Sequence, residues 1–205
     1  MTTEVGRRER KKAETRAALA QAAMRLALEH GVANVTADMI AEAADVAPRT
    51  FRNYFAGKEE AIVAELADGI RGITELLRAR PDGEPLWDSL RNVLTGIGSI
   101  PPEDLAQLAV KVRMIRASRA LLSSHLVGFE RAGEEFAAVI AERTGTDLDT
   151  DIYPRLTAAV MTTTLRMVFF AWLDGDGHAS LGDLMTEALA QVGSGLPEPG
   201  RRHHD

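Results

Sequence analysis

The sequence predicts an all-α protein. Apolar residues recur at three- and four-residue spacing along most of the chain, and glycines and prolines interrupt that pattern at intervals that suit helices joined by loops. The chain has 205 residues, 45% of them hydrophobic and 26% charged, which is the composition of a compact globular protein. These observations favour an N-terminal helix-turn-helix arrangement followed by a larger C-terminal helical domain.

The first helix is expected over residues 9–30. Gly31 follows its last turn and suits a left-handed C-terminal cap. The inward stripe of this helix comprises Ala18, Leu19, Ala22, Ala23, Leu26 and Ala27.

Two short helices and a long one follow. Thr36 can cap the second helix, and Pro48, with its fixed φ and missing N–H, suits the first position of a third that runs to about Tyr54. Gly57 interrupts the chain again, and a longer helix begins at Lys58. The apolar residues expected to face inward are Met39, Ile40, Ala43 and Ala44 in the second helix and Ile62, Leu66, Ile70, Ile73 and Leu77 in the long one.

Residues 36–55 have the apolar pattern of a helix-turn-helix. Helices of about eight and seven residues are too short to persist alone, so the helices before and after must hold them. The inward candidates are Ile40, Ala44, Val46, Phe51 and Phe55. The side chains left to face outward, which suit contacts with DNA bases and phosphates, are Arg49, Thr50, Arg52, Asn53 and Tyr54. The alternative is a mixed polar helix of an ordinary all-α protein, which would be expected to carry more Glu and Lys.

Positive charge gathers at one end of a chain whose net formal charge is −6. Residues 6–16 hold six basic residues against two acidic ones, and residues 1–58 hold 10 against 7. The remainder holds 14 basic against 23 acidic residues. A nucleic acid responds to charge gathered on one face, so the basic start is a candidate phosphate contact, with a merely solvated tail as the alternative.

The second half of the chain continues as helices. Pro, Asp and Gly indicate loops at 80–85 and 99–104, and polar stretches indicate others at 143–151 and 174–180. Helical stripes lie between them, and the last helix carries Leu181, Leu184, Met185, Ala188, Leu189 and Val192. The tail over 195–205 lacks apolar periodicity and is expected to be disordered.

Several functional classes find no support in the sequence. The chain has no cysteine, which excludes disulfides, thiol catalysis and thiolate metal sites. No apolar segment follows the basic N-terminus as in a signal peptide, and no apolar run approaches the ~18 residues that span a bilayer. Motifs of serine hydrolases, P-loop and dinucleotide-binding proteins and zincins are missing, and the five histidines are scattered. We expect a soluble, cytoplasmic protein that is no enzyme and has no metal, cofactor or membrane partner.

The stretch TADMIAEAADVAPRTFRNYFAGKEEAI, residues 36–62, resembles the DNA-binding signature of the TetR family of transcriptional regulators. The turn, the aromatic pair and the following Lys stand in the family's order, and with the preceding helix the match covers about residues 9–66. The resemblance implies a helix cap and phosphate contact at Thr36, phosphate contacts at Tyr54 and Lys58, and a recognition helix that carries Arg49, Thr50 and Arg52. With Asn53 beside them, these seven residues are the DNA-binding candidates.

Three positions depart from the family's pattern. Asp45 stands where the turn normally has Gly, and Asp tolerates the left-handed conformation better than most residues but less well than Gly. Ala47 replaces the usual Ser cap and forgoes its side-chain bond. Arg52 occupies a position where Tyr is commoner, so the family's contacts there do not carry over.

The resemblance implies a division into a DNA-binding domain at 1–58 and a domain at 59–194 that binds a small molecule and dimerises. In the family, the last two long helices of each subunit form a four-helix bundle. Independently, helix 152–173 is apolar on more than one side, which implies a partner surface. A deeply buried central helix of a monomer is the alternative.

The ligand-binding candidates are Trp87, Arg113, Met114, His125, Phe129, Met161 and Phe169. Met and aromatic side chains give adaptable apolar walls, although each could equally be an ordinary core residue. Arg113 and Arg166 lie in apolar stretches, where a buried guanidinium needs either an acidic ligand group or an internal carboxylate. The stretch from 113 to 145 is loosely similar to a domain of actinobacterial regulators, some of which sense fatty acyl-CoA thioesters.

The sequence therefore predicts a ligand-responsive repressor that binds a palindromic operator as a homodimer. The effector would be a small apolar or amphipathic molecule, with acyl-CoA as one candidate class. A helical small-molecule-binding module without sequence-specific DNA binding is the alternative.

Overall fold

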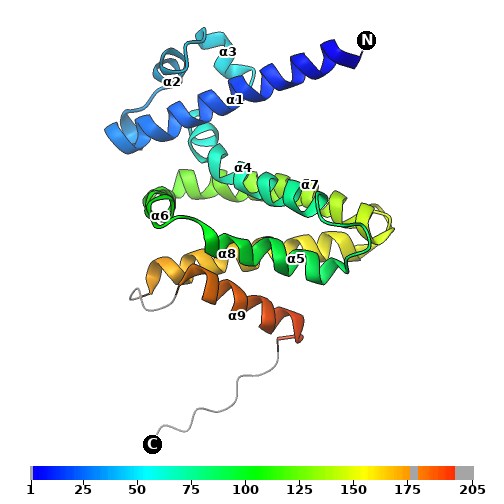
Figure 1. The fold of residues 1–205 in the computed structure, drawn as a ribbon. Helices are drawn as coiled ribbons and strands as arrows, with labels where there is room; N and C mark the ends of the chain where they lie inside the picture. Colours follow the sequence, from blue (N-terminus) through cyan, green and yellow to red (C-terminus); the bar gives the residue numbers. More distant parts are fainter. Residues whose placement is uncertain (1, 176–179, 197–205) are drawn as a thin grey trace, which may run out of the picture. The chain divides into compact units, whose positions relative to one another are not determined.

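The computed structural model describes residues 2–175 and 180–196, which form helices joined by loops, so the all-α fold class is confirmed (Figure 1). The elements are α1 (Thr2–His30), η1 (Val32–Asn34), α2 (Ala37–Ala43), α3 (Pro48–Arg52), α4 (Lys58–Arg78), α5 (Leu86–Thr95), η2 (Gly96–Ser99), α6 (Pro102–Ala117), α7 (Arg119–Thr144), α8 (Ile152–Asp174) and α9 (Leu181–Gly193). From residue 197 onward, the tail for which disorder is expected lies outside the described residues, together with its two histidines.

Contacts divide the chain into two compact units. Unit 1 comprises Met1–Arg71 and Ala106–Ala132, and unit 2 comprises Gly72–Leu105 and Gly133–Asp205. Helices α4, α6 and α7 each contribute residues to both units. Unit 1 thus takes in more of the chain than residues 1–58, the segment that stays our prediction for the DNA-binding domain.

Unit 1 is built on one hydrophobic core. Leu19 of α1 and Ile40 of α2 are fully buried in it, and Phe51 of α3 is 1% exposed. The same core contains Ile115 of α6 and Leu121 of α7. Residues from the second half of the sequence therefore complete the core that holds the three N-terminal helices.

Two residues expected to face inward are exposed. These are Ala18 of α1 and Ala43 of α2, whereas Ala20 and Ala41, each two residues away, are buried. A small side chain such as alanine fits both core and exposed positions, so the helical period alone does not fix which alanines face inward. Helix α1 also begins at Thr2 rather than at residue 9, because the Arg, Lys and Glu residues of this segment favour helix and no proline interrupts them.

Unit 2 packs α9 against α5, η2 and α8. Its buried side chains include Leu90 of α5, Phe136 of α7 and Met185 of α9. The backbones of Gly98 in η2 and Gly182 in α9 touch, since a Cβ added to Gly98 would lie 2.9 Å from the Cα of Gly182. Only glycine fits at this crossing.

Arg143 of α7 holds the end of α4 and the loop that leads to α5. Its guanidinium donates to the carbonyl oxygens of Arg80 (3.0 Å) and Pro81 (2.9 Å) and to the Ser89 hydroxyl (3.1 Å). Glu84 accepts hydrogen bonds from Arg80 Nε (2.7 Å) and Ser89 Oγ (2.5 Å). These bonds, that of Arg80 most of all, lower the pKa of Glu84 from 4.5 to about 2.

Helix α8 is long and mostly apolar, and Arg155 and Arg166 interrupt its apolar residues. Ile152–Asp174 contains an 18-residue window of mean hydropathy 1.5, so by length and composition this one helix among the described residues is apolar enough to cross a membrane. Only 22% of that window is buried inside the protein. Large apolar side chains of α8 that remain exposed are Ile152, Tyr153, Leu156 and Met167.

Candidate DNA-binding surface

The turn between α2 and α3 closes with the hydrogen bonds of a Schellman motif. The N–H of Val46 donates to the Ala41 carbonyl and that of Asp45 to the Glu42 carbonyl, both at 3.0 Å. Asp45 takes a φ of 53°, the left-handed conformation that the family usually gives to Gly. The sequence interpretation of Asp45 is thus confirmed.

The caps of α2 and α3 differ as expected. The Thr36 hydroxyl accepts a hydrogen bond from the Met39 N–H at 3.2 Å, which confirms Thr36 as the cap of α2. Ala47 caps α3 without a side-chain bond, and Pro48 occupies its first position. Helix α3 is shorter than expected, because Asn53 is its C-cap rather than an interior residue.

The recognition segment, residues 48–55, separates buried from exposed side chains cleanly. Phe51 and Phe55 are buried with ring centroids 5.8 Å apart. Arg49, Arg52 and Asn53 are exposed. This short helix thus presents two guanidinium groups and one carboxamide to solvent, the donors that suit guanine and adenine edges in a major groove.

Two other DNA-binding candidates lie partly inside the protein. Thr50 is half-buried, and Tyr54 is half-buried with its side chain packed against the core of unit 1. A phenol packed in this way presents only part of its side chain to solvent, which is compatible with a phosphate contact but not with insertion between bases.

Lys58 has a role that the sequence did not predict. Its Nζ donates to the carbonyl oxygens of Val32 (2.9 Å), Val35 (2.8 Å) and Ala33 (3.5 Å). The three N–H donors of the ammonium group thus face the segment between α1 and α2. The geometry makes Lys58 a tie between that segment and the start of α4, and its phosphate contact stays a prediction from the resemblance alone.

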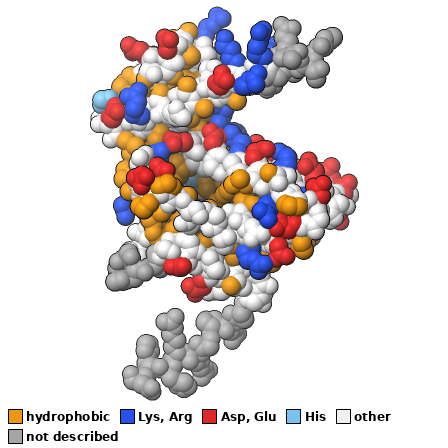
Figure 2. Space-filling model, viewed as in Figure 1, with side chains coloured by type: hydrophobic (Ala, Val, Ile, Leu, Met, Phe, Trp, Pro, Cys, Tyr) orange, Lys and Arg blue, Asp and Glu red, His pale blue; other side chains and the backbone are white. Residues whose placement is uncertain are grey.

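The basic N-terminal segment is the exposed start of α1. Arg7, Arg8, Arg10, Lys11 and Lys12 are exposed, whereas the helix first enters the core near Leu19. In Figure 2, Lys and Arg side chains gather at the top of the view, where Figure 1 draws α1 and α3. At 1.5 Å per residue, positions 2–15 extend the helix by about 20 Å. The segment is therefore a helical extension of α1 that presents five basic side chains to solvent.

The seven ligand-binding candidates are divided between the two units. Unit 1 contains Met114, His125 and Phe129. Met114 packs against the core of unit 1, and the ring centroids of His125 and Phe129 are 4.3 Å apart. Arg113 is also in unit 1 and is exposed, so its guanidinium needs no buried partner, contrary to expectation.

Unit 2 contains the other three ligand-binding candidates. Met161 is 2% exposed, Trp87 packs over Gly193, and Phe169 meets Trp172 edge to face. In these contacts all three serve the packing of unit 2, and their part in binding a ligand stays a prediction.

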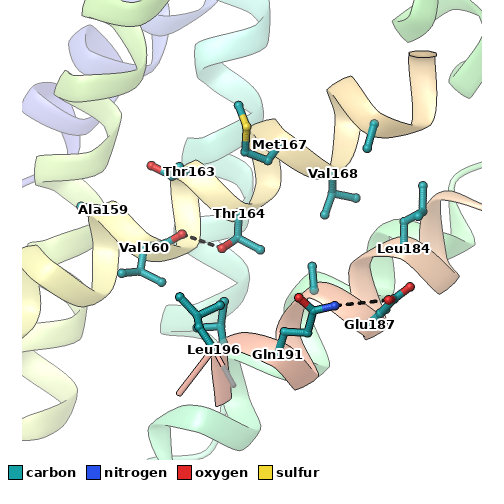
Figure 3. A pocket seen from close by; sticks show the side chains of 13 residues that line it. Ala159, Val160, Thr163, Thr164, Met167, Val168, Leu184, Glu187, Gln191 and Leu196 are labelled. Carbon is teal, nitrogen blue, oxygen red and sulfur yellow. Dashed lines mark hydrogen bonds between the residues drawn. The ribbon is translucent and has the colours of Figure 1, made fainter. Parts of the chain in front are cut away.

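An open apolar groove of about 710 Å³ runs between α8 and α9 in unit 2 (Figure 3). Figure 3 shows Thr163, Met167 and Val168 on α8 and Leu184 and Gln191 on α9 among the side chains that line it. In the sequence, this surface is indicated by helix 152–173, whose apolar residues occupy more than one side. None of the seven ligand-binding candidates lines this groove.

Comparison with protein families matches both halves of the chain. Residues 19–65 match the model of bacterial regulatory proteins of the tetR family, and residues 84–197 match that of the MftR C-terminal domain. The transcriptional regulator TcmR of Streptomyces glaucescens is 35% identical over 173 residues, which are 82% of this chain and 76% of TcmR. The chain belongs to the TetR family. It is accordingly a DNA-binding transcriptional regulator.

A second relative and two solved structures extend the comparison. The mycofactocin biosynthesis transcriptional regulator MftR of Mycobacterium tuberculosis is 26% identical over 187 residues, 91% of this chain and 93% of MftR. Thermus thermophilus FadR, solved with lauroyl-CoA, has a TM-score of 0.57 and 22% identity, with 91% of this chain and all of that one covered. The complex of SmeT with triclosan has a TM-score of 0.57 and 20% identity, with 92% and 100% covered. These structures share the fold of this TetR-family chain.

Proposed function

We propose that this TetR-family protein is a ligand-responsive repressor that binds a palindromic operator as a homodimer and releases it when a small apolar or amphipathic molecule binds. We place it in the cytoplasm, without a catalytic step and without a membrane partner. The observation that carries the proposal is the recognition segment, in which two exposed arginines stand on a helix locked by two buried phenylalanines.

Base reading is assigned to α3. Arg49 and Arg52 are three residues apart and so share one face of the helix, where either guanidinium can bond the O6 and N7 atoms of guanine. Asn53, at the C-cap, can bond adenine. Because α3 has five residues, its position depends on Phe51 and Phe55 in the core rather than on its own stability.

Phosphate contacts are assigned to the start of α1, to Thr36 and to Tyr54. Arg7, Arg8, Arg10, Lys11 and Lys12 are exposed along one helix, and each lysine or arginine that meets a phosphate adds to the salt dependence of binding. Such contacts place the protein on the duplex without reading the sequence.

The homodimer is assigned to the groove between α8 and α9. Met167 is 46% exposed and lines the groove, together with small and apolar side chains from both helices. A monomer would leave this surface in water, whereas a second copy placed by two-fold symmetry would cover it with the same two helices. Two recognition helices roughly 34 Å apart could then enter successive major grooves.

The effector class is inferred from chemistry and from the relatives. Lauroyl-CoA in the FadR complex and triclosan in the SmeT complex are amphipathic or apolar molecules. A ligand of this kind releases DNA only insofar as it binds better to the state that does not fit the operator. Acyl-CoA thioesters are therefore the first class to test.

The deciding experiment begins with selection of a duplex by the wild-type protein from a random double-stranded library. Binding of that duplex and of a scrambled one is then measured by fluorescence anisotropy across a salt series. Arg49→Ala and Arg52→Ala should each reduce the preference for the selected duplex by roughly 5- to 100-fold, because each removes a bidentate base contact. Arg25→Ala is the matched control, since Arg25 is an exposed arginine of α1 outside the recognition segment.

Two outcomes would contradict the proposal. If the wild-type protein selects no preferred duplex, the helical-module alternative stands. If the selected duplex is bound but lauroyl-CoA, other acyl-CoA thioesters and triclosan all leave it bound, the proposed effector class is wrong and the repressor function has to be tested with other ligands.

A further inference from the structure

Arg16 differs from the other basic residues at the start of α1. Arg7, Arg8, Arg10, Lys11 and Lys12 are exposed, but the Arg16 side chain is 28% exposed and faces α4. Its Nη1 donates to both carboxylate oxygens of Asp68, at 2.9 and 3.2 Å. Arg16 therefore belongs to the packed part of unit 1, unlike the five exposed basic residues before it.

The same guanidinium lies over the ring of Phe55. The Arg16 Cζ is 5.0 Å from the ring centroid, which is within the range of a cation–π contact. Phe55 ends the recognition segment, is 2% exposed, and contacts Phe51 in the middle of α3. One side chain of α1 thus reaches the recognition helix through two aromatic rings.

Asp68 fixes the other end of this arrangement. It also pairs with Arg71, whose Nη1 lies 2.5 Å from its Oδ1. Asp68 therefore keeps a cationic partner when Arg16 is removed, and the loss of Arg16 leaves no isolated carboxylate. What is lost is the link from α4 through the guanidinium to Phe55.

We propose that Arg16 is a positioning residue for DNA recognition, which sets the orientation of the recognition helix by holding Phe55 against α4 through Asp68. The inference rests on the proposed function, since it requires sequence-selective DNA binding. Arg16 meets neither base nor phosphate. A five-residue helix has little stability of its own. A change in the packing position of Phe55 would therefore change the orientation of α3 and of Arg49 and Arg52 on it.

A positioning residue and a phosphate contact differ in what their loss changes. Loss of a phosphate contact weakens binding to every duplex and reduces the slope of log affinity against log salt by about 0.9. Loss of the positioning residue weakens binding to the selected duplex more than to a scrambled one and leaves the slope unchanged. A lower folded fraction affects both duplexes equally and so cannot change their ratio.

The test uses the full-length protein and the duplex that the wild type selects. Arg16→Met keeps an unbranched apolar stem and removes the guanidinium, and Arg16→Lys keeps the positive charge. Arg10→Met is the matched control on the exposed part of α1. Anisotropy gives the ratio of affinities for selected and scrambled duplexes and the salt slope, and circular dichroism gives the folded fraction.

We expect Arg16→Met to reduce the affinity ratio roughly tenfold with an unchanged salt slope, and Arg16→Lys to restore part of the ratio. Arg10→Met should reduce the salt slope and leave the ratio of affinities for the two duplexes unchanged. A reduced slope with an unchanged ratio in Arg16→Met would show a phosphate contact and overturn the inference, as would a variant that changes neither quantity. If Arg16→Met does not fold, the test rests on Arg16→Lys alone. A ratio of affinities in Arg16→Lys equal to that of the wild type would then contradict the inference. Failure of the wild type to select any duplex would instead refute the proposed function.

Discussion

At the scale of single residues, the turn before the recognition helix is held in a conformation that its side chain does not favour. Asp45 has a φ of 53°. In this left-handed conformation the Cβ of most residues clashes with the backbone, whereas Gly has no Cβ and adopts it without strain. Asp45→Gly should therefore increase the free energy of unfolding by up to about 1 kcal/mol, measured by urea denaturation. Asp45→Ala is the paired variant and should decrease it. Equal effects of the two variants would mean that the left-handed conformation carries no cost here.

Lys58 gives a second prediction at this scale. Lys58→Met keeps the apolar stem and removes three donors from backbone carbonyls, so we expect a loss of roughly 1–3 kcal/mol in the free energy of unfolding. The salt slope of DNA binding separates the two roles of Lys58. An unchanged slope would mean that the three donors serve unit 1 alone, and a slope reduced by about one would support the phosphate contact that the resemblance implies.

The sequence could predict the exposed part of the site but not its internal ties. The four-residue interval between Phe51 and Phe55 places both rings on one side of a helix, so the exposure of Arg49 and Arg52 follows from periodicity. Nothing in the spacing distinguishes a lysine that meets phosphate from one that meets a carbonyl. For the same reason, Arg16 could not be separated from the other five basic residues of its segment before its contact with Asp68 was known.

At the scale of elements, the crossing of η2 and α9 depends on two glycines. Gly98→Ala or Gly182→Ala forces a Cβ to within about 3 Å of the opposite backbone, which cannot move as a side chain can. We expect each variant to lose roughly 1–3 kcal/mol in the free energy of unfolding. Gly133→Ala is the control, because its Cβ meets no atom within 4 Å and α7 should gain stability. Similar losses in all three would show that the close approach is not the cause.

The loop between α4 and α5 gives a prediction of pH dependence. The pKa of Glu84 is lowered from 4.5 to about 2 in the folded protein, first by the hydrogen bond from Arg80 and then by that from Ser89. A lowered pKa means that the carboxylate stabilises the fold fully above pH 4.5 and progressively less as the pH falls toward 2. Glu84→Gln should therefore show less loss of thermal stability between pH 5 and pH 2 than the wild type. Glu103→Gln, at an exposed site, should follow the wild type.

The sequence predicted the limits of the helices better than the contacts between helices. Gly31, Thr36, Pro48 and Gly57 are start and stop signals that act locally, which is why the end of α1 and the starts of α2, α3 and α4 agree with the sequence. The start of α1 has no such signal and was predicted seven residues too late. Helical periodicity shows which side of α6 and α7 is apolar but not what it packs against. The assignment of Ile115 and Leu121 to the core around α1 requires the three-dimensional structure.

At the scale of the whole molecule, the proposed dimer can be tested separately from DNA binding. Met167→Glu places a carboxylate in the groove between α8 and α9, where a second copy would have to bury it without a partner. We expect a monomer in analytical ultracentrifugation, with unchanged helicity and strongly reduced affinity for a palindromic duplex. Leu126→Glu is the control, since Leu126 is 43% exposed in unit 1 and does not line the groove. A dimeric Met167→Glu variant would place the interface elsewhere.

The packing of Ile115 and Leu121 has a consequence for hybrid regulators. Engineers who build biosensors join the DNA-binding segment of one regulator to the sensing segment of another. A graft of residues 1–71 alone would leave behind two large side chains of its own core and expose the surface they cover. The transferable piece is discontinuous: it needs residues 106–132 as well, or a host whose corresponding helices carry apolar side chains of matching volume.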